Sequence, residues 1–158
     1  MKILVIGAPK SGKTRFANKI GKEKNLKIFD GLDKKFVKKT DLALGELNDY
    51  RTDFMFISDI LMLENKHQDD DYVITAGPFY SYCHFACKAG LLDNDEKKMD
   101  LLWVMLAMSR IALDSLWYDE IYYLPYKKEE ETFSSYMDLS IRNTIRELYL
   151  KEKVKTIE

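Results

Sequence analysis

Residues 7–14 read Gly7-Ala8-Pro9-Lys10-Ser11-Gly12-Lys13-Thr14, and this stretch decides the fold. It matches G-x-x-x-x-G-K-[ST], the sequence pattern of a phosphate-binding loop. The apolar run KILVI, residues 2–6, precedes it, and a helical pattern over residues 12–24 follows it. Because the strand and the helix stand in the order that such a loop needs, we prefer this interpretation to a chance match in a turn rich in glycine and lysine.

Each residue type in this loop suits phosphate binding. The glycines let the backbone turn so that successive N–H groups point at phosphate oxygens, and the helix N-terminus adds partial positive charge. We expect Lys13 to reach the β- and γ-phosphates of ATP and the Thr14 hydroxyl to bind Mg²⁺. For Arg15, a phosphate contact and a solvated position on the helix are both open. The predicted cofactor-binding residues are Gly7, Ala8, Pro9, Lys10, Ser11, Gly12, Lys13, Thr14 and Arg15.

Apolar runs and helical patterns alternate along the whole chain. Further short strands are expected at residues 26–30, 72–75, 121–124 and 154–157. Further helices are expected at residues 33–39, 53–66, 79–89, 95–116 and 135–151, with Asp53 placed to cap the second of these. Strands that alternate with helices predict a parallel sheet covered on both faces. The expected fold class is α/β: one domain, residues 1–158, with the three-layer α/β/α P-loop NTPase fold and a mostly parallel five-stranded sheet.

The composition limits the partners that we expect. The chain has 158 residues, 25 Lys+Arg, 26 Asp+Glu and a formal net charge of -1, which is not the basic footprint of a nucleic-acid-binding protein. No apolar run approaches the length of a membrane span, and the apolar start is too short for a signal peptide. We therefore expect a cytoplasmic protein, in the host cytoplasm if it is phage-encoded, with a small-molecule substrate. The oligomeric state stays open, a homodimer included.

Two groups of residues are assigned to packing. Cys83 and Cys87 lie four residues apart in an apolar stretch, and no second Cys/His pair completes a zinc site. Free cysteines of this kind behave as small hydrophobes. Core packing is also expected for four residues that recur at helical spacing in an apolar helix: Trp103, Met105, Met108 and Trp117.

Two further segments carry a resemblance. Residues 73–87 read VITAGPFYSYCHFAC, a strand followed by a Gly-Pro turn and an aromatic helix, and residues 118–125 read YDEIYYLP. Together with the loop, they resemble the P-loop nucleoside and nucleotide kinases, especially the phage-type deoxynucleoside monophosphate kinases and the ribosylnicotinamide-kinase-like group. The resemblance implies transfer of the γ-phosphoryl group of ATP to a nucleoside or nucleoside monophosphate. It also implies that Phe79, Tyr80 and Tyr82 line the substrate pocket.

The third strand departs from this resemblance at its end. Thr75 and Ala76 stand where the kinase group has an acidic residue, which supports Mg²⁺ or acts as base toward the substrate hydroxyl. Ligand sites in open parallel sheets lie at the carboxyl ends of the strands, so Asp30, after the second strand, is the leading substitute. We predict that Asp30 has a catalytic and substrate-binding role. Asp53 and Asp59 are alternatives, and a turn-forming role for Asp30 also stays open.

Arginines are scarce in this chain. The lid of the kinase group carries several of them after the fourth strand, but residues 126–134 (YKKEEETFS) contain none. By the resemblance, Arg142 is predicted to be catalytic and Arg51 to hold the phosphate of the acceptor; for each, a structural role is equally open. Arg110 is expected to pair with Asp114 four residues on, and Arg146 to lie on a solvated face. The five arginines are Arg15, Arg51, Arg110, Arg142 and Arg146.

Two other classes of function stay open. A catalytically weak ATP-binding protein that acts through a partner would fit the missing strand-end carboxylate and the arginine-poor lid. A small ATPase of nucleic-acid metabolism would need a strand that ends in Asp or Asp-Glu, and neither residues 72–75 nor residues 121–124 end so. A GTPase is disfavoured because the sequence has no N-K-x-D element.

Overall fold

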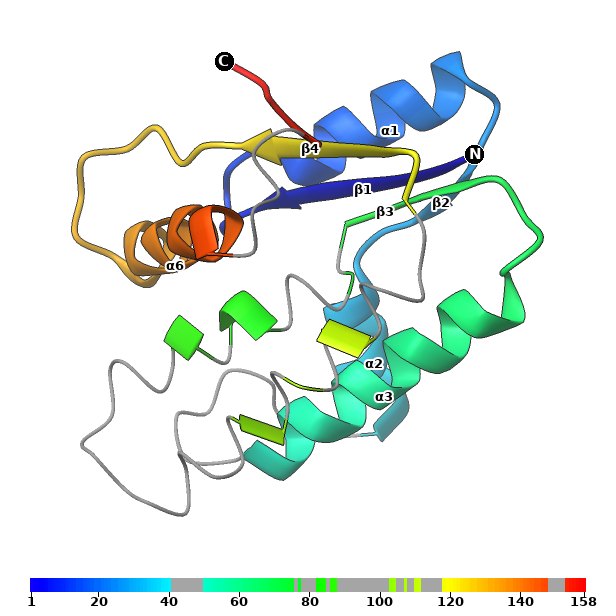
Figure 1. Ribbon diagram of the computed structural model, residues 1–158, viewed down its shortest axis with the longest axis horizontal. Helices are drawn as coiled ribbons and strands as arrows, with labels where there is room; N and C mark the ends of the chain where they lie inside the picture. The colour runs from blue at the N-terminus through cyan, green and yellow to red at the C-terminus, as the bar shows by residue number, and fades with distance from the viewer. Residues whose placement is uncertain are drawn as a thin grey trace.

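A five-stranded sheet forms the centre of the computed structural model (Figure 1). The structure describes residues 1–40, 50–75, 77, 82–84, 86–87, 103–104, 107, 110–111, 118–147 and 153–158, without the side chains of residues 37, 39, 40 and 50–54. The strand order is β2-β3-β1-β4-β5, and all four neighbouring pairs are parallel. The strands are β1 (Lys2–Gly7), β2 (Lys27–Phe29), β3 (Tyr72–Ile74), β4 (Glu120–Leu124) and β5 (Val154–Thr156).

Helices cover both faces of this sheet. Helix α1 lies on one face, and α2, α3 and α6 lie on the other side of the sheet (Figure 1). The predicted three-layer α/β/α fold with five strands is therefore confirmed. The bounds of the helices are α1 (Lys13–Glu23), α2 (Leu32–Thr40), α3 (Tyr50–Lys66) and α6 (Phe133–Glu147).

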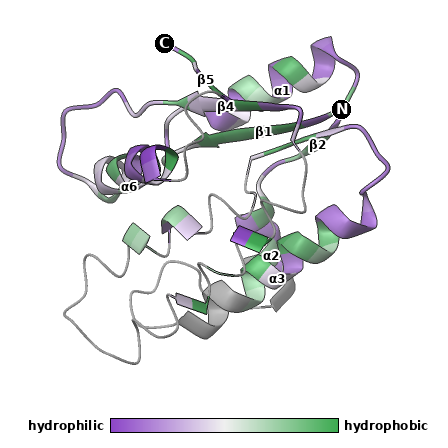
Figure 2. Ribbon diagram, viewed as in Figure 1, coloured by the Kyte–Doolittle hydropathy of each residue, from purple (hydrophilic) through white to green (hydrophobic). Residues whose placement is uncertain are grey.

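The side chains of β1 alternate between two hydrophobic cores. Ile3 and Val5 pack with Ala17 of α1, whereas Leu4 and Ile6 point into the core on the opposite face. In Figure 2, β1 is mostly hydrophobic, while α1, α3 and α6 carry both polar and apolar residues. Burial on both faces explains why β1 is a continuous apolar run in the sequence. The second core also contains Phe36 of α2, Phe56 and Ile60 of α3, and Met137, Ile141 and Ile145 of α6.

Two sequence-based expectations about helices are wrong. Helix α3 begins at Tyr50, so Asp53 lies in its first turn and is not its N-cap. An acidic residue is favoured in a first turn as well as at a cap, so the aspartate alone could not fix where the helix starts. Trp103 is 62% exposed, although core packing was expected. Periodicity shows which residues share a helix face, but it does not show which face is covered. Met105, Met108 and Trp117 lie outside the described residues.

The two cysteines pack in the core as expected. Cys83 and Cys87 are buried and free, on the same side of the sheet as α3 and α6. Burial raises the pKa of Cys83 to about 12 and that of Cys87 to about 11. Thiols that stay protonated at neutral pH are poor nucleophiles and metal ligands, so packing accounts for both residues.

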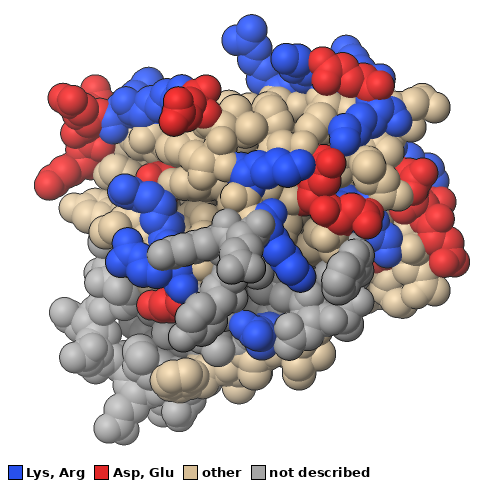
Figure 3. Space-filling view, turned by 45° about the horizontal axis from the view of Figure 1, so that its top comes forward, with Lys and Arg blue, Asp and Glu red and all other residues tan. Residues whose placement is uncertain are grey.

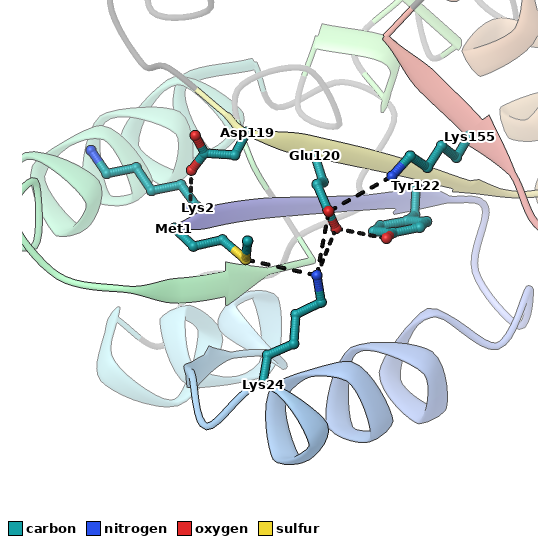
Figure 4. Close-up of polar contacts among 7 residues, drawn as sticks. All are labelled: Met1, Lys2, Lys24, Asp119, Glu120, Tyr122 and Lys155. Carbon is teal, nitrogen blue, oxygen red and sulfur yellow. Dashed lines mark hydrogen bonds and ion pairs between the residues drawn. The ribbon is translucent and has the colours of Figure 1, made fainter.

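A charged cluster joins α1 to the sheet at the end where the strands begin (Figure 4). The Lys24 Nζ lies 3.2 Å from Glu120 Oε2, and the Lys155 Nζ lies 3.7 Å from Glu120 Oε1. The Tyr122 hydroxyl donates to Glu120 Oε2 at 2.6 Å, and this bond lowers the pKa of Glu120. The cluster therefore links α1, β4 and β5 at the edge opposite to the loop of residues 7–14.

Helix α1 approaches β2 and β3 most closely at Gly21. A Cβ added there would lie 2.6 Å from Ile28 Cγ1 and 3.2 Å from Val73 Cγ1. Only the absence of a side chain allows this approach. The close contact brings the helix that follows residues 7–14 down onto the sheet.

We expect Gly21→Ala to destabilise the protein, even though the helix propensity of alanine is about 1 kcal/mol more favourable than that of glycine. Overpacking against Ile28 costs about 1–3 kcal/mol and outweighs that gain. Urea unfolding should give a lower midpoint at an unchanged slope. In an Ile28→Ala background the same substitution should cost less, and an equal cost in both backgrounds would show that the contact with Ile28 is not the cause.

Glu64 of α3 is a fully buried carboxylate beneath the sheet. Its Oε1 accepts hydrogen bonds from the Tyr118 hydroxyl at 2.6 Å and the Tyr72 hydroxyl at 3.1 Å, while Oε2 has no partner among the described residues. Burial raises the pKa of Glu64 above its ordinary value, against the two hydroxyl donors. The folded protein therefore favours the protonated carboxyl.

This raised pKa predicts a pH dependence of stability. The contribution of Glu64 is fully present below the ordinary carboxyl pKa and is lost as the pH rises through the folded-state value. As the pH rises from the ordinary carboxyl pKa to mildly alkaline values, the free energy of unfolding of the wild type should fall relative to that of Glu64→Gln, whose amide does not titrate. Urea unfolding of both proteins across this range measures the difference, and two parallel pH curves would contradict the prediction.

Candidate functional site

The loop between β1 and α1 makes a tight turn that exposes the first amides of the helix. Lys10 has φ 66° and Gly12 has φ 95°, both left-handed, and the Ser11 N–H donates to the Ala8 carbonyl at 3.2 Å. No side chain caps α1, and its first turn holds no acidic residue. Since the first N–H groups of a helix need acceptors, this end of α1 is suited to an anion.

The start of the loop has no room for a side chain. A Cβ on Gly7 would lie 2.4 Å from Ser11 Oγ and 2.8 Å from the Leu124 carbonyl oxygen of β4. The Ser11 Oγ is buried and has no hydrogen-bond partner among the described residues. A buried hydroxyl without a partner costs free energy, so this atom fits an oxygen of a bound phosphate. The residues of the loop therefore fit the phosphates that the motif predicts.

Lys13 lies across this loop. Its Nζ donates to the Ala8 carbonyl at 3.0 Å. Burial lowers the pKa of Lys13 to about 8, and the nearby carboxylates of Asp33 and Asp30 oppose that shift. The ammonium is thus partly desolvated in the free protein, and the negative charge of a phosphate would stabilise it.

Asp30 brings three segments together at the carboxyl ends of the strands. Its Oδ1 accepts a hydrogen bond from Thr75 Oγ1 at 2.6 Å and one from Thr14 Oγ1 at 3.2 Å. The Thr75 N–H donates to the Phe29 carbonyl at 3.1 Å, which continues the β2–β3 ladder and places Thr75 beside Asp30. Gly31, with φ 62°, then lets the chain turn into α2. The carboxylate therefore stands next to the first helical residues after the loop.

Thr75 is the part of this site that the sequence did not reveal. It stands where the resembling kinases have an acidic residue, and in sequence it signalled only a loss. In the structure its hydroxyl holds the carboxylate of the neighbouring strand. The sequence shows Asp30 after the second strand and Thr75 after the third. Only the strand order shows that these two strands are neighbours in the sheet.

Thr14 and Asp30 form an oxygen pair that suits Mg²⁺. This ion is commonly bound by one or two carboxylates together with substrate phosphates and water. Among the described residues, no group of three or more His, Cys, Asp and Glu side chains could hold a metal ion. Any metal at this site would therefore depend on the phosphates of a bound nucleotide for part of its coordination.

The remaining predicted residues are not all brought to the loop. Arg15 is exposed on the first turn of α1. Asp59 of α3 lines a groove together with Lys35 and Lys66. Tyr82 is half-buried and packs against the core on the α3 and α6 side, and this burial raises its pKa. Outside the described parts are Phe79, Tyr80, Asp114 and the side chains of Arg51 and Asp53.

Arg142 lies on α6 beside the edge strand β5. Its Nε is 3.2 Å from Asp138 Oδ2, and its side chain is 56% exposed. It lines a pocket with residues of β4, α6 and β5, and no residue of the loop contributes to that pocket. The predicted catalytic role of Arg142 stays a prediction.

The described surface is mixed in charge. On the face shown in Figure 3, basic and acidic side chains are both spread over the described residues. Among the helices that the structure describes, none combines the length and apolar composition needed to cross a membrane.

Solved structures share the fold of this chain, whereas no family model and no curated protein sequence matches it. NadR protein in complex with NR superposes with a TM-score of 0.76 at 12% identity, over 98% of this chain and 42% of the NadR chain. Deoxyadenosine kinase from M. mycoides, with the products dCMP and dCDP, superposes with a TM-score of 0.71 at 11% identity, over 100% of this chain and 90% of the kinase chain. Thymidylate kinase from Ehrlichia chaffeensis superposes with a TM-score of 0.64 at 13% identity, over 99% of this chain and 91% of the kinase chain.

These comparisons establish the fold. The chain spans less than half of the NadR chain but nearly the whole length of the two kinases. At 11–13% identity the similarity is one of architecture. The protein has a P-loop kinase-like fold, as the loop of residues 7–14 and the resemblance predicted.

Proposed function

We propose that the protein transfers the γ-phosphoryl group of ATP to a nucleoside or nucleoside monophosphate. One observation carries the proposal: the Asp30 carboxylate, held by Thr75, lies within hydrogen-bond distance of Thr14 at the start of α1. Phosphate-binding groups and a carboxylate thus meet at one edge of the sheet. Phosphoryl transfer needs this juxtaposition, because its catalysis is mostly positioning and neutralisation of charge.

In this proposal the loop residues bind the donor. The amides at the start of α1, the Ser11 hydroxyl and the Lys13 ammonium contact the phosphates of ATP, and the Thr14 hydroxyl would bind Mg²⁺. When bound, the ion supplies charge neutralisation between the β- and γ-phosphates. Donors of this kind lower the barrier because they are already oriented toward the developing charge.

Asp30 acts on the acceptor. Both of its recorded hydrogen bonds go to Oδ1, so among the described residues Oδ2 remains for the acceptor hydroxyl. The acceptor oxygen forms a bond to the γ-phosphorus as the bond to the bridging oxygen of ADP breaks. With a nucleoside acceptor the hydroxyl proton goes to Asp30, whereas with a monophosphate acceptor an ionised phosphate oxygen attacks and no proton is transferred. The products are ADP and the phosphorylated acceptor.

The acceptor class rests on the neighbours by fold. A deoxyadenosine kinase and a thymidylate kinase both share this architecture over nearly their whole length. One is named for a nucleoside and the other for a nucleotide, so the fold supports both acceptors and does not select one. Arg51, Phe79, Tyr80 and Tyr82 remain the residues that we propose for acceptor binding.

A second candidate is an ATP-binding protein with weak transfer activity that acts through a partner. The segment after β4 favours it, because residues 126–132 contain no arginine, and Lys127 and Lys128 are exposed. A screen of the purified protein against all nucleosides and monophosphates, read as ADP formation, separates the two. Activity on one or a few acceptors supports the kinase, and a flat response supports the partner-binding protein.

We expect Asp30→Asn to lower the rate of phosphoryl transfer by about 10²–10⁴ while ATP still binds, since general-base catalysis contributes that much. Asp69→Asn is the matched control, because Asp69 is an exposed carboxylate in the turn between α3 and β3, at the end of the sheet opposite to the loop, and it should leave the rate unchanged. Thr75→Val should also lower the rate, because the carboxylate loses its 2.6 Å hydrogen bond. Full transfer by Asp30→Asn would refute the assignment.

Lys13→Ala tests the loop separately. It should abolish productive ATP binding, since the charge that faces the β- and γ-phosphates is lost. Equilibrium dialysis or fluorescence titration with an ATP analogue measures the affinity. An unchanged affinity would remove the basis for the whole proposal.

The lowered pKa of Lys13 predicts proton uptake on nucleotide binding. In the free protein Lys13 is largely neutral above its pKa of about 8, and the bound phosphates should raise that value. The affinity for a non-hydrolysable ATP analogue should therefore fall as the pH rises above 8. Calorimetry in two buffers of different ionisation enthalpy should show more proton uptake at pH 9.0 than at pH 7.5. Lys13→Arg stays charged and should show none; a buffer-independent enthalpy for the wild type at pH 9.0 would contradict the prediction.

A further inference from the structure

A second pocket with basic side chains lies between α6 and the edge strand β5, apart from the loop. Its volume is about 260 Å³, and it is lined by Tyr123, Arg142, Ile145, Arg146, Val154 and Thr156. Residues 7–14 and Asp30 do not contribute to it. The site proposed for ATP therefore does not explain this pocket.

The choice of arginine in this pocket is selective. Only five of the 25 basic residues in the chain are arginines, and two of these five line this one pocket. Arg142 and Arg146 are four residues apart, so they project from the same face of α6. Arginine differs from lysine by its planar fork of N–H donors, which matches the oxygens of phosphate and carboxylate groups.

Asp138 fixes one of the two arginines. Asp138 is buried, and its Oδ1 accepts hydrogen bonds from the Tyr123 hydroxyl at 2.8 Å and the Tyr126 N–H at 3.0 Å. Its Oδ2 lies 3.2 Å from the Nε of Arg142. A guanidinium has five N–H donors, so this ion pair orients Arg142 and leaves donors for a ligand.

The charge of the pocket is positive. Among the described residues, two arginines line the pocket and one of them pairs with the carboxylate of Asp138. The charge of Glu147 contributes to the raised pKa of Tyr82 and of Cys83, so this carboxylate lies near residues 82 and 83. Lys155 lies over the ring of Tyr122 and pairs with Glu120, whereas its neighbours Val154 and Thr156 line the pocket. The pocket thus offers arginine donors and a threonine hydroxyl above the apolar side chains of Ile145 and Val154.

We propose that this pocket binds the phosphate group of a small phosphorylated molecule, as a second anion site that is independent of the loop. Arg142, held by Asp138, and Arg146 contact the phosphate oxygens, and the apolar side chains contact the body of the ligand. The volume suits a small phosphomonoester, because pockets for drug-sized ligands begin at about 300 Å³.

The test uses the full-length Lys13→Ala protein, whose loop has lost its lysine and should bind phosphate more weakly. Titration with inorganic phosphate and with phenyl phosphate, at constant ionic strength set by chloride, is followed by calorimetry and by the amide NMR signal of Thr156. We expect saturable binding of both probes with a shift of that signal. Arg146→Gln in the same background should weaken binding at least tenfold, and Arg146→Lys should restore it only in part, because lysine keeps the charge but not the fork.

Lys155→Gln is the matched control, because it removes a positive charge from the same strand outside the pocket, and it should leave binding unchanged. The proposal is overturned by any of three results: no phosphate binding once Lys13 is removed, equal binding by the Arg146→Gln protein, or binding of succinate with phosphate inert. Arg146 is exposed and is substituted in preference to Arg142, whose loss would leave the buried Asp138 unpaired. None of these outcomes depends on whether the protein transfers phosphoryl groups.

Discussion

Burial of β1 on both faces is the constraint on which the rest of the structure depends. Ile3 and Val5 face α1, and Leu4 and Ile6 face α3 and α6, so one strand joins the two cores. As the central strand of a parallel sheet, β1 must end at the same edge as its neighbours. The loop of residues 7–14 is thereby placed beside the ends of β3 and β4.

Close packing at this edge sets the shape of the loop. Gly7 lies against Ser11 and Leu124, and Gly21 lets α1 come down onto β2 and β3. Gly7 thus allows the tight turn before α1, and Gly21 allows α1 to pack closely against the sheet. An unfilled helix N-terminus, the buried Ser11 hydroxyl and a desolvated Lys13 follow from that geometry. The site therefore combines helix amides that no side chain caps, a buried hydroxyl without a partner among the described residues and an ammonium that burial desolvates.

The acidic group of the proposed site is displaced by one strand from its expected position. In the resembling kinases the carboxylate follows the third strand, whereas here Thr75 follows β3 and Asp30 follows β2. Because β2 and β3 are neighbours, the carboxylate still reaches Thr14. The fold thus brings a carboxylate next to the phosphate-binding loop from β2 instead of from β3. Residues 126–132, directly after β4, contain no arginine, whereas two of the five arginines of the chain line the pocket between α6 and β5.

The sequence by itself determined the loop, the five parallel strands and the α/β class, because these depend on local motifs and on the alternation of short apolar runs with helical patterns. It also placed Asp30 at the end of a strand. Only the tertiary structure decided that Thr75 supports Asp30, that Arg142 pairs with Asp138 beside β5, and that Trp103 is exposed. These depend on strand order and on which helix face is covered, contacts between residues far apart in the chain that no local pattern encodes.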